Sequence, residues 1–297
     1  MIFKFLILLL FVGHVASYTY KYVNDPKLFE VVNANWKVAI DMYKQLLKKN
    51  PGDGFLFSPY SMIVDLLGLH EGANGHTANA IRCKLGLANI TSHYKCKWEV
   101  QFDSVIQGQF KTVDGAFKPQ TYMEKTGVFK IGYIPNLSLR ILELPYFNNT
   151  LASYIFLPNC SVGLTAFETS RLDTKTLIDL IAALKPMNAR ISIPRFEASS
   201  HHQLSSDFEA IGLGNLFTPG EADFSRIYSN AVADKLALNY YVQQASVSFD
   251  IEGANSPSQE TPVNPETTEE FKADHSFLYV IIGKRRNVPF FIGRYNG

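Results

Sequence analysis

Cysteine is the first residue type in this sequence that could do chemistry. The three cysteines are Cys83, Cys96 and Cys160, and they can form at most one disulfide, so the chain is not a disulfide-dense scaffold. In an oxidising compartment we expect one pair and one odd thiol, and Cys83 and Cys96 are closest in sequence. The alternative is that they remain buried free thiols. Neither a CxxC pair nor a His-rich ligand spacing occurs, so we expect no metal and no cofactor.

Asparagine offers a second chemistry, because Asn-x-Ser/Thr sequons are acceptors for N-glycosylation in a secreted chain. The asparagines in such sequons are Asn89, Asn136, Asn148 and Asn159. Asn148 is the best candidate, since it lies in a polar turn between two apolar runs.

Motifs of the common enzyme classes are missing from the sequence. It contains no GxSxG elbow, no HExxH helix, no phosphate-binding P-loop and no GxGxxG turn. Serine, histidine and aspartate occur without the spacing that would identify a nucleophile and its base. We therefore expect that the protein is not an enzyme.

The first residues and the charge balance indicate the compartment and the kind of partner. Residues 1–17 combine one lysine, an apolar stretch and small residues, which is typical of a secretory signal peptide. A membrane anchor is the alternative, but the apolar stretch is shorter than the roughly 20 residues of a spanning helix. Removing Lys4 from the 28 basic residues leaves 27, against 27 acidic ones. We expect a secreted, extracellular protein with no nucleic-acid or membrane partner, because both partners favour a basic excess.

The elements that must position these residues change in type along the chain. Helical spacing of apolar residues dominates the first third, and apolar runs dominate from Phe110 onward. The predicted helices are 33–49, 59–69, 77–85, 173–185 and 204–213. The predicted strands are 55–57, 127–133, 138–145, 151–157, 189–196, 245–251, 277–282 and 288–292. The pattern indicates a single α+β domain over residues 18–297, with His201 and His202 in a solvated loop.

One segment fits neither periodicity. Residues 253–270 read GANSPSQETPVNPETTEE, with three prolines, four glutamates and no basic residue. This composition cannot bury enough apolar surface to offset the entropy lost on ordering, so we predict an exposed, mobile loop. Long structureless loops inside a domain usually carry function.

Several blocks of the sequence, in the same order, resemble the serpin family of serine protease inhibitors. FKADHSFLY at 271–279 and FFIGR at 290–294 are similar to the family's C-terminal signature. Other similar blocks are FSPYS at 57–61, EGANGHT at 71–77, LELPY at 142–146, FLPN at 156–159 and LFTP at 216–219. The resemblance implies three mixed β-sheets with surrounding helices and an exposed reactive loop. A target protease would cleave this loop, which would then insert as a strand into the largest sheet.

The resemblance also assigns roles within the loop. It places the hinge at Glu252, Gly253, Ala254, Asn255 and Ser256. It places the candidate scissile bond between Thr267 and Thr268. The chain itself would supply no catalytic side chain.

Two departures from the family pattern bear on trapping. The chain is shortened by an internal gap near residues 88–95, where the family has a sheet-face helix, outer strands and most of the strand that borders the insertion slot. The main sheet would keep two long strands, near 189–196 and 239–251. In addition, the loop prolines lack the N–H that a central strand must donate; they are Pro257, Pro262 and Pro265.

These departures favour a secreted serpin-family protein that lacks protease trapping and acts as a binding module or decoy. The alternative is a functional suicide-substrate inhibitor of an extracellular serine protease. A third interpretation is a fragment that folds poorly, because missing strands expose apolar sheet edges. We expect the partner to be an extracellular serine protease or another secreted protein, and the chain to be a monomer.

Overall fold

The computed structural model describes residues 26–85, 102–146, 149–160, 163–226, 236–251, 268–285 and 287–297. The predicted signal peptide at residues 1–17 lies outside the described residues, as does the predicted gap near residues 88–95.

Helices and strands alternate along the described chain. The helices are α2 (Pro26–Lys49), α3 (Pro59–Gly72), α4 (Gly75–Leu85), α5 (Leu164–Ser170), α6 (Thr174–Ala182) and α7 (Ser205–Phe208), with the short turns η1 (Pro135–Leu137), η3 (Glu209–Leu213) and η4 (Gly214–Phe217). The strands are β1 (Phe55–Phe57), β2 (Ser104–Lys111), β3 (Phe117–Ile134), β4 (Leu139–Pro145), β5 (Leu151–Pro158), β6 (Lys185–Pro194), β7 (Phe196–Gln203), β8 (Val242–Phe249), β9 (Glu269–Lys272), β10 (Phe277–Gly283) and β11 (Val288–Tyr295).

Two helices begin at capping residues that the sequence predicts. Ser58 precedes Pro59, and its side chain accepts a hydrogen bond from the Ser61 backbone at the start of α3. Asp173 caps α6 in the same way, by accepting from the Thr176 backbone at 2.9 Å. The helix α6 ends at Ala182, before its predicted end at Lys185, and Lys185 is the first residue of β6.

Nine strands form one continuous sheet in the order β1-β11-β10-β5-β4-β3-β6-β9, with β2 also paired to β3. The resemblance implied three sheets, and two of them are joined here because β3 is 18 residues long. It pairs with β2 over residues 117–124, with β6 over 122–131 and with β4 over 130–134.

The second sheet has two strands in the described residues, β7 and β8, paired antiparallel from Phe196↔Phe249 to Gln203↔Val242. The sequence predicted one strand at 189–196 in this sheet, which is wrong. Residues up to Pro194 pair within the nine-stranded sheet, and the chain crosses to the second sheet at Arg195. In the part of the chain that the structure describes, β8 matches the predicted strand near 239–251, and its partner is β7 and not the predicted strand at 189–196.

The two adjacent histidines lie in β7 and not in a loop. Their side chains alternate, as strand geometry requires, so that His201 is exposed and His202 is half-buried. The His202 imidazole lies 2.9 Å from the Leu56 carbonyl oxygen. Burial lowers the pKa of His202, which favours the neutral ring.

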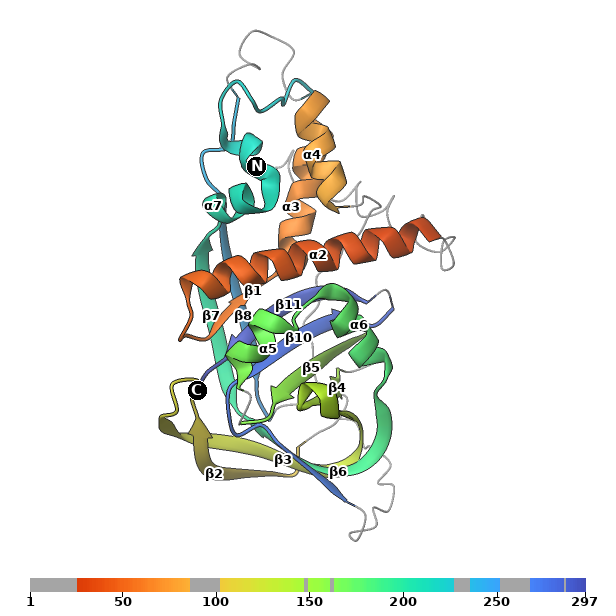
Figure 1. The fold of residues 1–297 in the computed structure, drawn as a ribbon, viewed down its shortest axis with the longest axis vertical. Coiled ribbons are helices and arrows are strands. Elements are labelled where there is room, and N and C mark those ends of the chain that lie inside the picture. The colour runs from red at the N-terminus through yellow and green to blue at the C-terminus, as the bar shows by residue number, and fades with distance from the viewer. Residues whose placement is uncertain are drawn as a thin grey trace.

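The large sheet has a hydrophobic cluster on each face. In Figure 1, α5 and α6 lie over β5 and β10 of this sheet. One cluster packs it against helices and includes Trp36 and Tyr43 of α2, Phe167 of α5 and Leu177 of α6. The other cluster packs it against the small sheet and includes Phe196, Ala245 and Phe249. The small sheet is therefore a layer opposite α2, α5 and α6.

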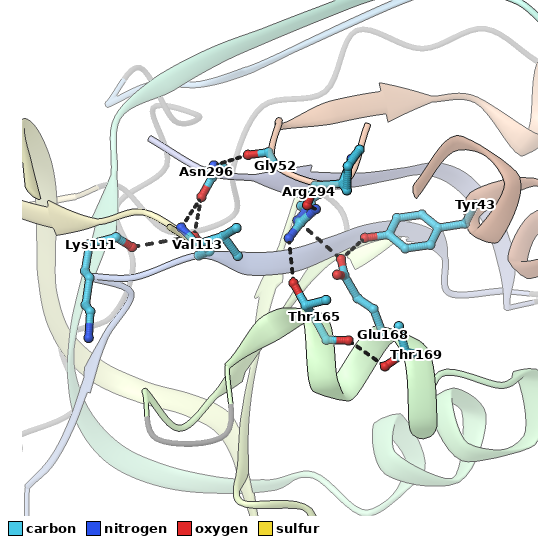
Figure 2. Close-up of polar contacts among 11 residues, drawn as sticks. Tyr43, Gly52, Lys111, Val113, Thr165, Glu168, Thr169, Arg294 and Asn296 are labelled. Atoms are coloured by element: carbon cyan, nitrogen blue, oxygen red, sulfur yellow. Dashed lines mark hydrogen bonds and ion pairs between the residues drawn. The ribbon is translucent and has the colours of Figure 1, made fainter. Parts of the chain in front are cut away.

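A buried ionic cluster ties the last strand to two helices (Figure 2). Arg294 of β11 and Glu168 of α5 have fully buried side chains, with Nε and Oε1 3.5 Å apart. The Tyr43 hydroxyl of α2 donates to the same Glu168 oxygen at 2.5 Å. Arg294 also donates to the Pro51 carbonyl at 2.8 Å and to Thr165 Oγ1 at 3.1 Å. These contacts hold β11, α5 and α2 together.

Candidate functional site

The candidate site is the pair of anchors that hold the predicted loop, together with the edge of β8. The first anchor is the end of β8 at residues 249–251, and the second begins at Thr268. The hinge residues 252–256 and Thr267 lie outside the described residues. The site is therefore built from the elements to which the two loop ends are fastened.

An aromatic stack and an ion pair fasten the first anchor. The Phe249 side chain is 1% exposed, and its ring stacks on that of Phe196 with centroids 4.5 Å apart. The next residue, Asp250, pairs with Arg195 through two contacts, Nε–Oδ1 at 2.8 Å and a second nitrogen to Oδ2 at 3.1 Å. Arg195 lowers the pKa of Asp250, so the carboxylate is ionised at neutral pH. This anchor belongs to the small sheet.

The second anchor belongs to the large sheet. The strand β9 pairs in parallel with β6, from Ala189↔Glu269 to Ser192↔Lys272. Its Phe271 side chain is fully buried, and the Arg140 guanidinium lies over the ring, 5.3 Å from the centroid. Arg140 also donates to the Glu270 carbonyl. The candidate scissile residue Thr268 is half-buried directly before this strand.

Asp274 and His275 hold the chain beyond β9. The two nitrogens of His275 lie 2.9 Å from Asp274 Oδ1 and 2.6 Å from the Pro158 carbonyl oxygen. Both neighbours are hydrogen-bond acceptors, so each ring nitrogen of His275 has a partner. The hydrogen bond from His275 lowers the pKa of Asp274.

Gln243 fastens the other end of β8, a role that was not predicted from the sequence. The Gln243 side chain is 5% exposed and forms two hydrogen bonds with the backbone of Ser58. The Ser58 N–H donates to Oε1 at 2.7 Å, and Nε2 donates to the Ser58 carbonyl at 2.8 Å. The Ser58 hydroxyl donates to the Phe290 carbonyl at 2.8 Å. The strand β8 is thereby pinned to the start of α3 and to β11.

The loop insertion that the family resemblance implies would require a new strand to pair with β8. Within the described ranges, the ladder partner of β8 is β7 and no other strand. Insertion between two strands needs hydrogen-bonding ladders on both sides. Among the described residues, β8 is available as one of these two neighbouring strands.

The remaining predicted site residues are dispersed. Asn136 is exposed in η1, and Asn159 is exposed just after β5, whereas Asn89 and Asn148 lie outside the described residues. Cys160 is an exposed free thiol. The proposed Cys83–Cys96 pair cannot be placed, because Cys96 lies outside the described residues.

Over the described ranges, no three side chains of His, Cys, Asp or Glu gather closely enough to hold a metal ion. In the same part of the chain, no helix is both long and apolar enough to cross a membrane.

Comparison with known proteins gives consistent matches. The family model described as "Serpin (serine protease inhibitor)" matches residues 33–94 and 87–297. The two matches meet over residues 87–94, where the sequence predicts the internal gap. Because together they cover most of the chain, they determine its family.

Two curated human relatives illustrate the extent of the similarity. Plasminogen activator inhibitor 2 is 28% identical over 218 residues, which are 69% of this chain and 51% of that protein. Leukocyte elastase inhibitor is 29% identical over 230 residues, 72% of this chain and 58% of that protein. The matched region thus spans little more than half the length of these relatives.

Solved structures share the fold. A crystal structure of maspin aligns with a TM-score of 0.80 at 20% identity and covers 91% of this chain and 99% of that chain. Uncleaved ovalbumin aligns with a TM-score of 0.77 at 16% identity. At these identities the likeness supports the three-dimensional arrangement alone.

Proposed function

Because the chain belongs to the serpin family, we propose that it is a secreted protein that offers its loop to a partner without trapping a protease. In this role it acts as a binding module or decoy. The partner is an extracellular serine protease or another secreted protein. The residues of this chain bind the partner and catalyse no reaction.

The observation that carries this proposal is the pairing of β8. A cleaved loop becomes a central strand only if both neighbouring strands can hydrogen-bond to it. Among the described residues, β8 and β7 are the whole of the small sheet. The strand that leads into the loop at Ile251 is therefore β8. It pairs with β7 on one side, and the described residues supply no strand on its other side.

The composition of the loop supports the same conclusion. Pro257, Pro262 and Pro265 each remove a donor that a central strand needs. The acidic residues Glu266 and Glu269 flank the candidate scissile bond and do not suit a trypsin-like pocket. These features are compatible with a loop that is bound or cut and does not insert.

A functional suicide-substrate inhibitor is the second candidate. It is favoured by the names of the relatives, which include a plasminogen activator inhibitor and a leukocyte elastase inhibitor. In that case the protease would remain covalently attached to the cleaved chain.

Denaturing gels separate these two functions. The secreted protein is incubated with a panel of serine proteases, and the products are boiled and resolved. We expect cleavage within 253–270 and no covalent complex. A boiling-resistant complex with any protease of the panel would establish trapping and reject the proposal.

Secretion has its own test. Expression from the full coding sequence in eukaryotic cells should give a protein in the medium whose N-terminus is Tyr18, since cleavage is predicted after Ser17. A mass shift on removal of N-glycans should map to one or more of the four sequons. Retention inside the cell with Met1 intact would contradict this part of the proposal.

A further inference from the structure

The turn between β3 and β4 carries one of the four sequons. The hairpin closes at the pair Ile134↔Leu139, and η1 fills the turn between these two residues. Asn136 lies in the middle of η1 and is exposed. Ser138, the third residue of the sequon, adopts a left-handed conformation with φ 47°, and its N–H donates to the Pro135 carbonyl at 3.1 Å. The sequon is therefore held in a tight turn that points away from the core.

The Asn136 side chain is available for modification. Among the described residues it makes no hydrogen bond or ion pair, and no residue of η1 is buried. An N-linked glycan is bulky and is compatible with a fold only where the asparagine lies on the surface. A glycan on Asn136 would displace none of the contacts that hold β3 to β4.

An exposed aromatic ring lies three positions before this asparagine. Tyr133 is 60% exposed, although most of its side chain is apolar. Only Ile134 and Pro135 separate it from Asn136, and the Pro135 ring restricts the backbone between them. The first sugar of an N-glycan, N-acetylglucosamine, has a face of C–H groups. The face of an aromatic ring is electron-rich and attracts such groups, so the ring and the sugar are complementary.

We propose that Asn136 carries an N-linked glycan whose first N-acetylglucosamine packs on the exposed ring of Tyr133. In the transfer, a bond forms between Asn136 Nδ2 and the anomeric carbon of a lipid-linked oligosaccharide. The bond from that carbon to the lipid diphosphate breaks, the lipid diphosphate leaves, and the amide gives up one proton. The packed sugar covers apolar surface and stabilises the β3–β4 turn. This inference rests on the secretion proposed above, because the secretory pathway supplies the oligosaccharide donor.

Peptide mapping of the secreted full chain tests whether Asn136 is modified. Peptide N-glycosidase in heavy-oxygen water converts each occupied asparagine to a labelled aspartate. We expect the label at Asn136 and its loss in Ser138→Ala, which destroys the sequon and keeps the asparagine. A secreted chain without label at Asn136 would overturn this inference and leave secretion intact. A chain retained in the cell without any glycan would contradict both.

Thermal unfolding tests the contact with the ring. An endoglycosidase that leaves one N-acetylglucosamine on each occupied asparagine is applied to the wild-type chain and to Asn136→Gln, both made with oligomannose glycans. The wild-type chain should melt about 2–4 °C higher, the shift expected for one contact of this kind in a domain of this size. The same pair made in bacteria, without sugars, should melt within about 1 °C of each other.

Variants of two exposed tyrosines assign this shift to the ring. Tyr133→Ala should abolish the shift, and Tyr133→Phe, which keeps the ring, should preserve it. The matched control is Tyr240→Ala, which removes a tyrosine that is 65% exposed before β8 and should leave the shift unchanged. The absence of a shift in the wild-type comparison, or a shift that survives Tyr133→Ala, would overturn the proposed contact.

Discussion

Arg294 carries a full positive charge in a position from which water is excluded. Its compensation comes from Glu168, which is held in turn by the Tyr43 hydroxyl. Removing one partner of a buried ion pair leaves the other charge uncompensated, which costs far more than losing an exposed pair. This cluster therefore dominates the residue-scale energetics of the last strand.

We predict that Arg294→Met lowers the free energy of unfolding by about 3–5 kcal/mol. The matched control is Lys175→Met, which removes the exposed pair between Lys175 and Asp179 and should cost under about 1 kcal/mol. Urea denaturation followed by circular dichroism measures both. Equal losses for the two variants would show that burial does not set the cost.

The pH dependence of the same variant follows from the Glu168 pKa. Burial raises this pKa, and Arg294 opposes the rise. A carboxyl whose pKa is raised by folding stabilises the protein when protonated, and that stabilisation is lost as the pH increases through the folded-state pKa. Removing Arg294 raises the pKa further, so the stability deficit of Arg294→Met should widen between pH 5 and pH 8.

The check is a set of urea titrations at both pH values. The double variant Glu168→Gln/Arg294→Met has no carboxyl at this position and should show no widening. A deficit that shrinks with rising pH would mean that Glu168 is not the group that responds.

Residue roles of this kind could not be predicted from the sequence. Gln243 is in phase with Ala245 and Phe249 in the alternating strand pattern, which places it on the buried face but does not identify Ser58 as its partner. Similarly, Arg294 was assigned only to a terminal signature. In each case the role depends on partners more than 100 positions away in the chain.

At the scale of elements, substitutions of Gln243 and Gln244 test how β8 is attached to Ser58 at the start of α3. We predict that Gln243→Leu costs about 1–3 kcal/mol, because it leaves the Ser58 N–H buried without a partner, while the Ser58 carbonyl keeps the hydrogen bond from the Met62 N–H. Gln244→Leu, on the exposed face of the same strand, should change stability by less than about 0.5 kcal/mol. Hydrogen exchange should also accelerate in β8 for the first variant and remain unchanged for the second. Comparable effects of the two variants would contradict the assigned clamp.

Most elements could be predicted from local patterns, and the exceptions have physical causes. The capped starts of α3 and α6 and the apolar strands β10 and β11 were confirmed close to their predicted bounds. The boundary between β6 and β7 was missed because Arg195 is the single residue between the two strands. A change of sheet without an intervening loop leaves no turn segment in the sequence.

At the scale of the whole molecule, the proposal that the loop does not insert rests on two features, the pairing of β8 with β7 and the loop prolines, and they can be tested separately. Replacing Pro257, Pro262 and Pro265 with alanine restores the missing donors and leaves the sheet as it is. We predict that this triple variant still forms no boiling-resistant complex with any protease that cuts the loop. Complex formation by the variant alone would show that the prolines, and not the sheet, prevent trapping.

The most direct measurement of the central claim is the thermal unfolding midpoint before and after the loop is cut. Limited proteolysis within 253–270, with the cut confirmed by mass spectrometry, gives the two samples for calorimetry. Strand addition to a sheet would bury new ladders and raise the midpoint by tens of degrees on the scale of about 4 °C per kcal/mol. The structure predicts a midpoint unchanged within about 3 °C on that scale, because β8 lacks a described second neighbour. A large increase after cutting would show that the segment inserts and would contradict the account.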